Sequence, residues 1–252
     1  MLKHLVLGGL SALPARVKKS IVNVGFNVDR EHFQTMATRY LFAPDMRRGL
    51  EFMREKGLNP HSILDIGAYE GNWAKMALSV WPDAQVTMIE ANPEKTPILR
   101  KALPNAKLIE VLLGPDDKIV PYFVMESGSS VLEENSPLDR KQIRLKQCTL
   151  DSLDVSADFI KMDVQGYELE VLKGGEKTLS KTQAALIELS LLEINKGCPI
   201  LDEALCFMRE RGFVSYDILE LHRRPLDGAM NQVDILFVPE TSPLRADKRH
   251  YA

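Results

Sequence analysis

Short aliphatic segments alternate with helical segments along the chain from residue 60 onward. Strands are predicted over residues 62–66, 85–89, 106–111, 158–162, 184–189, 213–219 and 233–238. Between the first two strands, apolar side chains recur at helical spacing and would pack in a core, namely Trp73, Met76, Ala77, Val80 and Trp81. Strands separated by helices are typical of a parallel sheet wrapped by helices, so the pattern predicts a seven-stranded α/β domain.

Segments outside this alternation predict additional parts. Residues 31–57 are interpreted as two helices that break at Pro44 and stop at Gly57, and that cover one edge of the sheet or the mouth of its pocket. Residues 118–125 and 144–149 are expected to be extended, on either side of the polar loop 126–140, where α/β folds carry ligand loops. We therefore divide the chain into a helical extension or lid (1–59), a main domain (60–240) and a tail (241–252).

Composition makes the chain an average globular protein, apart from its first thirty residues. Of 252 residues, 45% are apolar and 27% are charged, and the net charge is −3. The first thirty residues, however, carry Lys3, Arg16, Lys18, Lys19 and Arg30 against a single acid, Asp29. We interpret residues 1–13 as an amphipathic helix that packs on its own domain or on a partner. Alternatives are a peripheral membrane contact through residues 1–25 and a homodimer contact.

The charge pattern and the cysteines limit which cellular compartment and which partners are expected. The three cysteines, Cys148, Cys198 and Cys206, form no CxxC pair, which favours a reducing compartment. The sequence has no run of eighteen apolar residues, and its start lacks a convincing signal-peptide cleavage site. We therefore expect a cytoplasmic protein, with membrane association as an open alternative. No basic stripe with interleaved aromatics is visible, so nucleic acid is not an expected partner.

A glycine loop follows the first predicted strand. Gly67 suits a tight turn near a ligand, and Gly71 lets the next helix start close to the strand. Asp65 ends the strand before Gly67, where a carboxylate would repel a diphosphate but could accept hydrogen bonds from a cationic amino-acid ligand. Glu90 ends the next strand, where an acid can hold both hydroxyls of a ribose. Together these residues favour S-adenosylmethionine over NAD.

A second polar segment ends the fourth predicted strand. Asp163 lies at the carboxyl end of that strand, near the point where ligands bind in open sheets. Lys161, two residues earlier, points to the same face of the strand. The two residues could form a buried salt bridge or the polar floor of a methyl-transfer site, and both roles are compatible.

Five spaced motifs resemble those of one protein family. They are LDIGAYEGNWA (64–74), IEANP (89–93), SGSSVLEEN (127–135), TLDSL (149–153) and FIKMDVQGYELEVLKGG (159–175). The chain is similar to FkbM-type class I S-adenosylmethionine-dependent methyltransferases over roughly residues 60–240. The resemblance implies a Rossmann-like, mostly parallel sheet of order 3-2-1-4-5-7-6 with helices on both faces and residues 232–238 as the antiparallel strand. It also implies that the methionine part of the cofactor contacts Asp65, Gly67, Ala68 and Gly71, the ribose Glu90, the adenine Leu113 and Gly114, and the reactive methyl Asp163. To this cofactor set we add the neighbouring residues Tyr69, Ala91, Asn92 and Val164.

Two positions depart from the family pattern. Tyr69 stands where the family usually has Asn, so its bulky side chain must swing outward or cover the ligand. Gln165 stands where the family usually has Glu, which weakens the case for a metal or a base at that position.

A hydroxyl acceptor benefits from a base that takes its proton while the methyl group is transferred. Candidate catalytic residues are Asp163, Glu168 and His222, with Glu188 as a further carboxylate. His222 lies in residues 221–225, which we interpret as a loop before the last strand, where a solvated turn is favoured over a catalytic role. Ser129 and Ser130 are candidate hydrogen-bond donors to a polyol or to the cofactor. The sequence shows no His/Asp/Glu cluster at ligand spacing, so no structural metal is predicted, and a loosely held divalent ion at Asp163 and Glu168 stays open.

Three functions remain after this reasoning. The leading hypothesis is O-methylation of a hydroxyl on a sugar, glycolipid or other small natural-product acceptor, with S-adenosylmethionine as the methyl donor. An NAD(P)-dependent oxidoreductase is the second, and Asp65 argues against it. A catalytically silent cofactor-binding scaffold is the third, to which Tyr69 and Gln165 give modest support.

Overall fold

The computed structural model describes residue 14, residues 16–17, residue 20 and residues 44–251. The described residues from Pro44 onward form one compact unit, and the expected boundary at residue 60 stays a prediction. The predicted amphipathic helix at residues 1–13 and the first of the two helices expected in residues 31–57 lie outside the described residues. The second of these helices is α4 (Met46–Glu55), and Gly57 follows it in a left-handed conformation.

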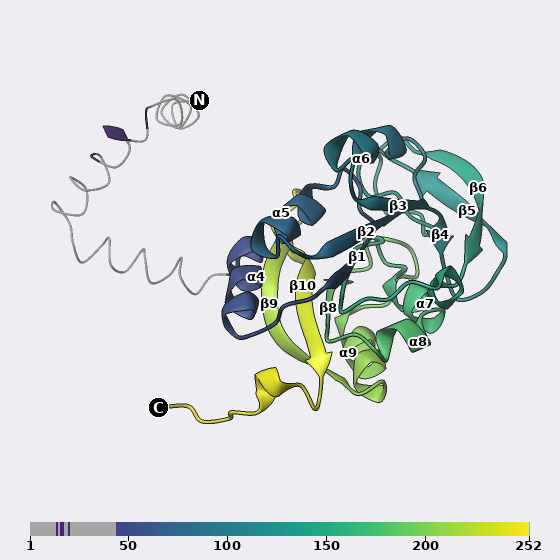
Figure 1. Cartoon of the computed structure of the whole chain (residues 1–252). Helices are drawn as coiled ribbons and strands as arrows, with labels where there is room; N and C mark the ends of the chain where they lie inside the picture. Colours follow the sequence, from purple (N-terminus) through teal and green to yellow (C-terminus); the bar gives the residue numbers. More distant parts are fainter. Residues whose placement is uncertain (1–13, 15, 18–19, 21–43, 252) are drawn as a thin grey trace. The chain divides into compact units, whose positions relative to one another are not determined.

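One seven-stranded sheet organises the unit that begins at Pro44 (Figure 1). Its strands, in spatial order, are β3 (Lys107–Glu110), β2 (Gln85–Glu90), β1 (Ser62–Ile66), β7 (Phe159–Met162), β8 (Ala184–Ser190), β10 (Met230–Pro239) and β9 (Phe213–Arg223). Neighbouring strands are parallel, except that β10 is antiparallel to both β8 and β9. This arrangement confirms the expected order 3-2-1-4-5-7-6 with an antiparallel last strand.

Helices cover both faces of this sheet. On one face, α4 and α5 (Asn72–Val80), with α6 (Thr96–Ala102), bury side chains such as Leu50, Ala77 and Leu99 against Phe159 and Leu236. On the other face, α7 (Glu168–Lys173), α8 (Glu176–Leu179) and α9 (Leu201–Glu210) pack on the alternate positions of the same strands. The two periodicities of the sequence, near 3.6 in helices and 2 in strands, therefore produce two separate cores.

The predicted apolar helix between the first two strands is confirmed as α5. Ala77 and Val80 are buried, and Trp81 ends the helix with its indole N–H donating to the carbonyl of Leu58 at 2.9 Å. Trp73 and Trp81 both pack against Phe159, with ring centroids 5.9 and 5.6 Å apart. This aromatic group fixes α5 on the sheet just after the glycine loop.

A small three-stranded sheet lies beside β3, where the regular alternation of the sequence lapses (Figure 1). It contains β4 (Leu112–Leu113), β6 (Lys141–Cys148) and β5 (Ile119–Val124), in that order. The two expected extended segments are thus confirmed, and the polar loop 126–140 connects them. The 3₁₀ helix η1 (Leu150–Leu153) leads on toward β7, and a second one, η2 (Pro243–Arg245), follows β10.

Among the described residues, no helix is both long and apolar enough to cross a membrane.

Candidate cofactor and methyl-transfer site

The glycine loop after β1 adopts a backbone that few residues tolerate. Gly67 has φ +76°, and a Cβ atom at this position would lie 1.8 Å from the carbonyl oxygen of Asp163. The loop therefore packs directly on the end of β7, and only glycine fits there. Tyr69 also has a positive φ, +52°, and its half-exposed ring lies under the ammonium of Lys95, 3.9 Å from the ring centroid. Its bulk is accommodated by turning toward that lysine.

Glu90 ends β2 and faces the same loop. One carboxylate oxygen accepts a hydrogen bond from the backbone N–H of Tyr69 at 2.8 Å, and the other accepts one from Asn92 at 2.7 Å. Burial raises the pKa of this carboxyl, and the backbone N–H groups of Asn92, Tyr69 and Ala91 oppose that rise. Each oxygen keeps a lone pair free, so the carboxylate can accept two further hydrogen bonds.

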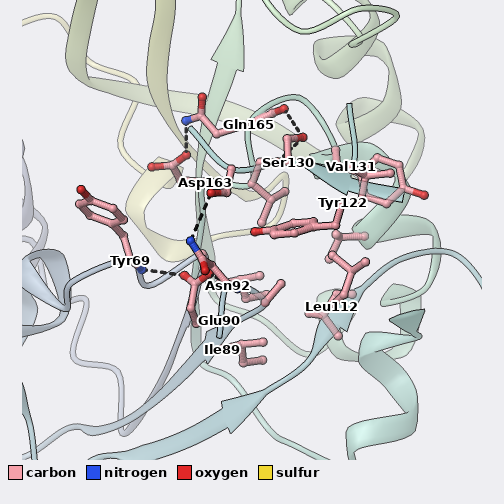
Figure 2. A pocket seen from close by; sticks show the side chains of 18 of the residues that line it. Tyr69, Ile89, Glu90, Asn92, Leu112, Tyr122, Ser130, Val131, Asp163 and Gln165 are labelled. Carbon is pink, nitrogen blue, oxygen red and sulfur yellow. Dashed lines mark hydrogen bonds between the residues drawn. The ribbon is translucent and has the colours of Figure 1, made fainter. Parts of the chain in front are cut away.

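These elements line one cavity at the carboxyl ends of the strands (Figure 2). Figure 2 shows Tyr69, Glu90 and Asp163 on one side of it and Leu112, Tyr122 and Val131 on the other. The predicted cofactor residues that line it are Gly67, Tyr69, Glu90, Ala91, Asn92, Leu113, Asp163 and Val164. The cavity is thus polar near the glycine loop and apolar near β4 and β5.

Other predicted cofactor residues lie outside the cavity lining. Asp65 and Ala68 are buried next to it. Gly71 packs near Leu99, and a Cβ on Gly114 would lie 2.4 Å from the side chain of Gln147. Close packing therefore accounts for both glycines.

Much of the apolar wall of the cavity was not predicted from the sequence. Tyr122 is 4% exposed and Leu112 is 7% exposed, and both line the cavity. The sequence of β5, IVPYFV, has no alternation of polar and apolar residues, so nothing in it singled out Tyr122 as a buried position. Ser129 and Ser130 also line the cavity, but both bond within the protein: the Ser130 hydroxyl donates to the carbonyl of Gln165 at 2.9 Å, and Ser129 bonds Met125.

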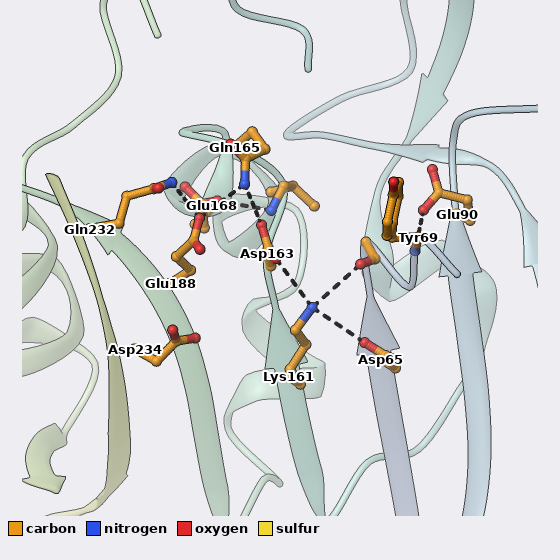
Figure 3. A network of polar contacts seen from close by, with 12 residues as sticks. Asp65, Tyr69, Glu90, Lys161, Asp163, Gln165, Glu168, Glu188, Gln232 and Asp234 are labelled. Carbon is orange, nitrogen blue, oxygen red and sulfur yellow. Dashed lines mark hydrogen bonds and ion pairs between the residues drawn. The ribbon is translucent and has the colours of Figure 1, made fainter. Parts of the chain in front are cut away.

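A buried ion-pair network connects β1 and β7 (Figure 3). The ammonium of Lys161 lies 3.6 Å from Asp65 and 3.5 Å from Asp163. Burial alone would lower the pKa of Lys161, but Asp163 and Asp65 raise it above its ordinary value. Burial raises the pKa of Asp65, against the attraction of Lys161. The expected buried salt bridge is confirmed, and it holds Asp163 at the cavity wall.

The hydrogen bonds of Gln165 explain why an amide stands where the family usually has Glu. It has φ +57°, and its amide nitrogen donates to Asp163 at 2.8 Å and to Glu188 at 3.0 Å. A glutamate here would place a third carboxylate between two others. The neutral amide instead bridges them, because its N–H₂ group has two donors.

Glu168 lies at the start of α7 and is only 5% exposed. Its carboxylate accepts hydrogen bonds from the backbone N–H groups of Val164 at 2.9 Å and Gly166 at 3.1 Å. Burial raises its pKa to about 7. These contacts hold the turn that carries Asp163 and Gln165, and Glu168 is not among the residues that line the cavity.

The interpretation of residues 221–225 as a loop is wrong at His222. This residue lies within β9, opposite Gln232 of β10. Its Nε2 atom is 2.8 Å from a carboxylate oxygen of Asp234 and 3.7 Å from one of Glu188. The hydrogen bond with Asp234 raises the pKa of the imidazole above its ordinary value. His222 is not among the cavity-lining residues, and Glu188, His222 and Asp234 form a cluster of metal-ligating groups that sequence spacing did not reveal.

Comparison with known proteins decides the family. Residues 65–215 match the sequence model described as "Methyltransferase FkbM domain". The chain belongs to the FkbM methyltransferase family. Members of this family use S-adenosylmethionine as methyl donor, which is therefore the cofactor. The 2-O-methyltransferase NoeI of Sinorhizobium fredii (strain NBRC 101917 / NGR234) is 28% identical over 159 residues. That match spans 54% of this chain and 65% of NoeI, which is less than two thirds of the relative's length.

Solved structures include distant matches to this FkbM-family chain. Magnesium protoporphyrin IX methyltransferase (ChlM) from Synechocystis PCC 6803, solved with bound SAM, matches with a TM-score of 0.47 and 9% identity over 77% of this chain and 79% of that one. The 1,6-didemethyltoxoflavin-N1-methyltransferase of Burkholderia thailandensis matches with a TM-score of 0.45 and 13% identity, covering 90% and 91% of the two chains.

The cavity suits the cofactor of the FkbM family. Glu90 is buried without an ion-pair partner among the described residues and keeps free lone pairs for two ribose hydroxyls. Leu112, Leu113 and Tyr122 offer an apolar surface of the kind that adenine requires. Asp65 is fully buried behind the glycine loop and pairs with Lys161 at 3.6 Å, so it acts on the cavity through its position under this loop.

Proposed function

We propose that this protein methylates a hydroxyl group of a sugar, glycolipid or other small natural-product acceptor. One observation carries the proposal: Asp163 lies at the cavity wall with 31% of its side chain exposed, held by Lys161 and Gln165. A fixed carboxylate at this point can accept a proton from a hydroxyl. The name of the relative NoeI, a 2-O-methyltransferase, supports oxygen as the acceptor atom.

Each part of the cavity has a distinct task in this proposal. The cofactor supplies an activated methyl group, whose transfer requires the acceptor oxygen, the methyl carbon and the leaving sulfur to lie in line. Glu90 holds the ribose, and the apolar wall of Leu112, Leu113 and Tyr122 holds the adenine. Lys161 fixes the position of Asp163 through their ion pair, so that this carboxylate orients the acceptor hydroxyl and takes its proton.

The polar groups beyond Asp163 support an acceptor that carries hydroxyl groups. Gln165, Glu188 and Gln232 form a hydrogen-bonded set on the same side of the sheet (Figure 3). Amide and carboxylate groups in this density suit an acceptor with several hydroxyls, such as a sugar.

The test is methyl transfer from labelled S-adenosylmethionine to a panel of sugars, glycolipids and phenols. We expect label on a sugar or glycolipid hydroxyl. The variant Asp163→Asn should lose turnover while its affinity for S-adenosylhomocysteine stays within about threefold of wild type, and Asp117→Asn, a change at an exposed carboxylate, is the matched control. Tight cofactor binding without transfer to any acceptor would instead support the silent scaffold. Equal loss of turnover and cofactor affinity in Asp163→Asn would make this residue a binding residue.

A further inference from the structure

Three metal-ligating side chains from three strands meet outside the cofactor cavity. They are Glu188 of β8, His222 of β9 and Asp234 of β10, and one ligand atom from each lies within 4.8 Å of the others. His222 Nε2 is 2.8 Å from Asp234 and 3.7 Å from Glu188. Donor atoms bound to one ion at about 2.0–2.2 Å from it would lie at such separations from each other.

Strand register explains why these residues meet. In the pairing of β10 with β8, Asp234 lies opposite Glu188, and in the pairing of β10 with β9 it lies opposite Glu220. Three carboxylates thus stand side by side across three strands, and like charges in directly opposed positions are destabilising. Glu188 and Asp234 are 8% and 5% exposed, so water screens them poorly. A positive charge close to these three carboxylates would reduce their mutual repulsion.

Lys161 attracts Glu188 and Asp234 through space but forms no ion pair with either of them. Lys161 lies 3.5–3.6 Å from Asp163 and Asp65 and forms its ion pairs with these two residues. A protonated His222 would supply one charge against Glu188 and Asp234. A divalent cation would balance both carboxylates.

The contacts of Glu188 divide its two oxygens into separate roles. Oε1 accepts hydrogen bonds from the amide nitrogens of Gln165 and Gln232. Oε2 faces His222, and no described residue donates a hydrogen bond to it. A carboxylate held through one oxygen while the other is left free is the arrangement found for metal ligands oriented by their outer contacts.

We propose that Glu188, His222 and Asp234 bind one divalent transition-metal ion. One imidazole nitrogen and two carboxylate oxygens suit Mn²⁺, Fe²⁺ or Zn²⁺ better than they suit Mg²⁺ or Ca²⁺, which prefer oxygen ligands alone. Gln165 links Glu188 to Asp163, so the ion lies one amide bridge away from the proposed methyl-transfer residue. The proposal concerns metal binding and does not depend on the acceptor.

The experiment titrates metal-stripped full-length protein with MnCl₂ and counts free Mn²⁺ by its electron paramagnetic resonance signal. We expect saturation at one ion per chain. The variants His222→Ala and Asp234→Asn should weaken Mn²⁺ binding by at least about tenfold. Glu220→Gln is the matched control, because it removes a charge from the same carboxylate row without removing a ligand, and its affinity should stay within about threefold of wild type.

Two outcomes would overturn the metal site. Absence of saturable binding would mean that His222 and Asp234 form an acid–base pair without a metal. If Glu220→Gln weakens Mn²⁺ binding as much as Asp234→Asn does, the three carboxylates attract cations only through their summed charge, without a defined site. Circular dichroism shows whether each variant folds. If the ligand variants do not fold, pulsed electron paramagnetic resonance on the Mn²⁺-loaded wild type still tests the site. A directly bound imidazole gives a nitrogen coupling in this spectrum, and the absence of that coupling contradicts the proposal.

Discussion

Glu168 links the chemistry of the site to the stability of the fold. Its carboxylate is 5% exposed and holds the turn before α7 through two backbone N–H groups. Burial raises its pKa to about 7 from the ordinary value of 4.5. Because the pKa is higher in the folded state, the folded protein binds this proton more tightly than the unfolded chain does. The stabilisation is complete below pH 4.5 and is lost as the pH rises through 7.

The variant Glu168→Gln tests this account. Its amide oxygen can still accept both backbone hydrogen bonds, but the side chain carries no charge at any pH. One pKa unit corresponds to about 1.4 kcal/mol, so the raised pKa lowers the free energy of unfolding of the wild type by about 2.5 kcal/mol between pH 5 and pH 8. The free energy of unfolding of Glu168→Gln, relative to wild type, should rise by that amount over this range.

Urea denaturation followed by circular dichroism at several pH values from 5 to 8 measures this difference. The matched control is Glu170→Gln on the same helix, where the side chain is 33% exposed and no buried charge is removed. A difference between Glu168→Gln and wild type that stays flat across the range would refute the reasoning. So would an equal trend in Glu170→Gln.

Three further changes test other parts of the structure. Glu90→Ala should weaken S-adenosylhomocysteine binding by at least about tenfold, or roughly 1.4 kcal/mol, in calorimetry, and unchanged affinity would remove Glu90 from the ribose site. Gly67→Ala places a Cβ 1.8 Å from the carbonyl oxygen of Asp163 at φ +76°, and should lower the free energy of unfolding in urea by at least about 1 kcal/mol. Trp81→Phe removes the hydrogen bond to Leu58 and should cost about 1 kcal/mol in the same assay, whereas no loss would mean that water replaces the indole N–H.

The centre of the sheet was predictable because its strands there are buried on both faces. β1 and β8 are apolar runs apart from one acid near the carboxyl end and one serine at a terminus, and such runs stand out in the sequence. The end of β9 was not predictable by the same signal. It is an edge strand whose residues 220–223 are polar or exposed, so the pattern resembles a turn although Leu221 and His222 pair with β10.

Some residues of the candidate site were also predictable from the sequence and others were not. Asp65, Glu90 and Asp163 each end a strand, and parallel strands bring their carboxyl ends to one edge, so their proximity follows from the sequence. His222 and Glu188 are far apart in the chain and meet only through the antiparallel β10. No local spacing encodes that contact, which is why the sequence showed no ligand cluster where the structure has one.

Calorimetric titration of the full-length protein with S-adenosylhomocysteine and, separately, with NAD tests the cofactor site most directly. The geometry around Glu90 and Asp65 predicts one S-adenosylhomocysteine bound per chain, no saturable binding of NAD, and loss of at least about tenfold in affinity in Glu90→Ala. Saturable binding of NAD without binding of S-adenosylhomocysteine would contradict the account.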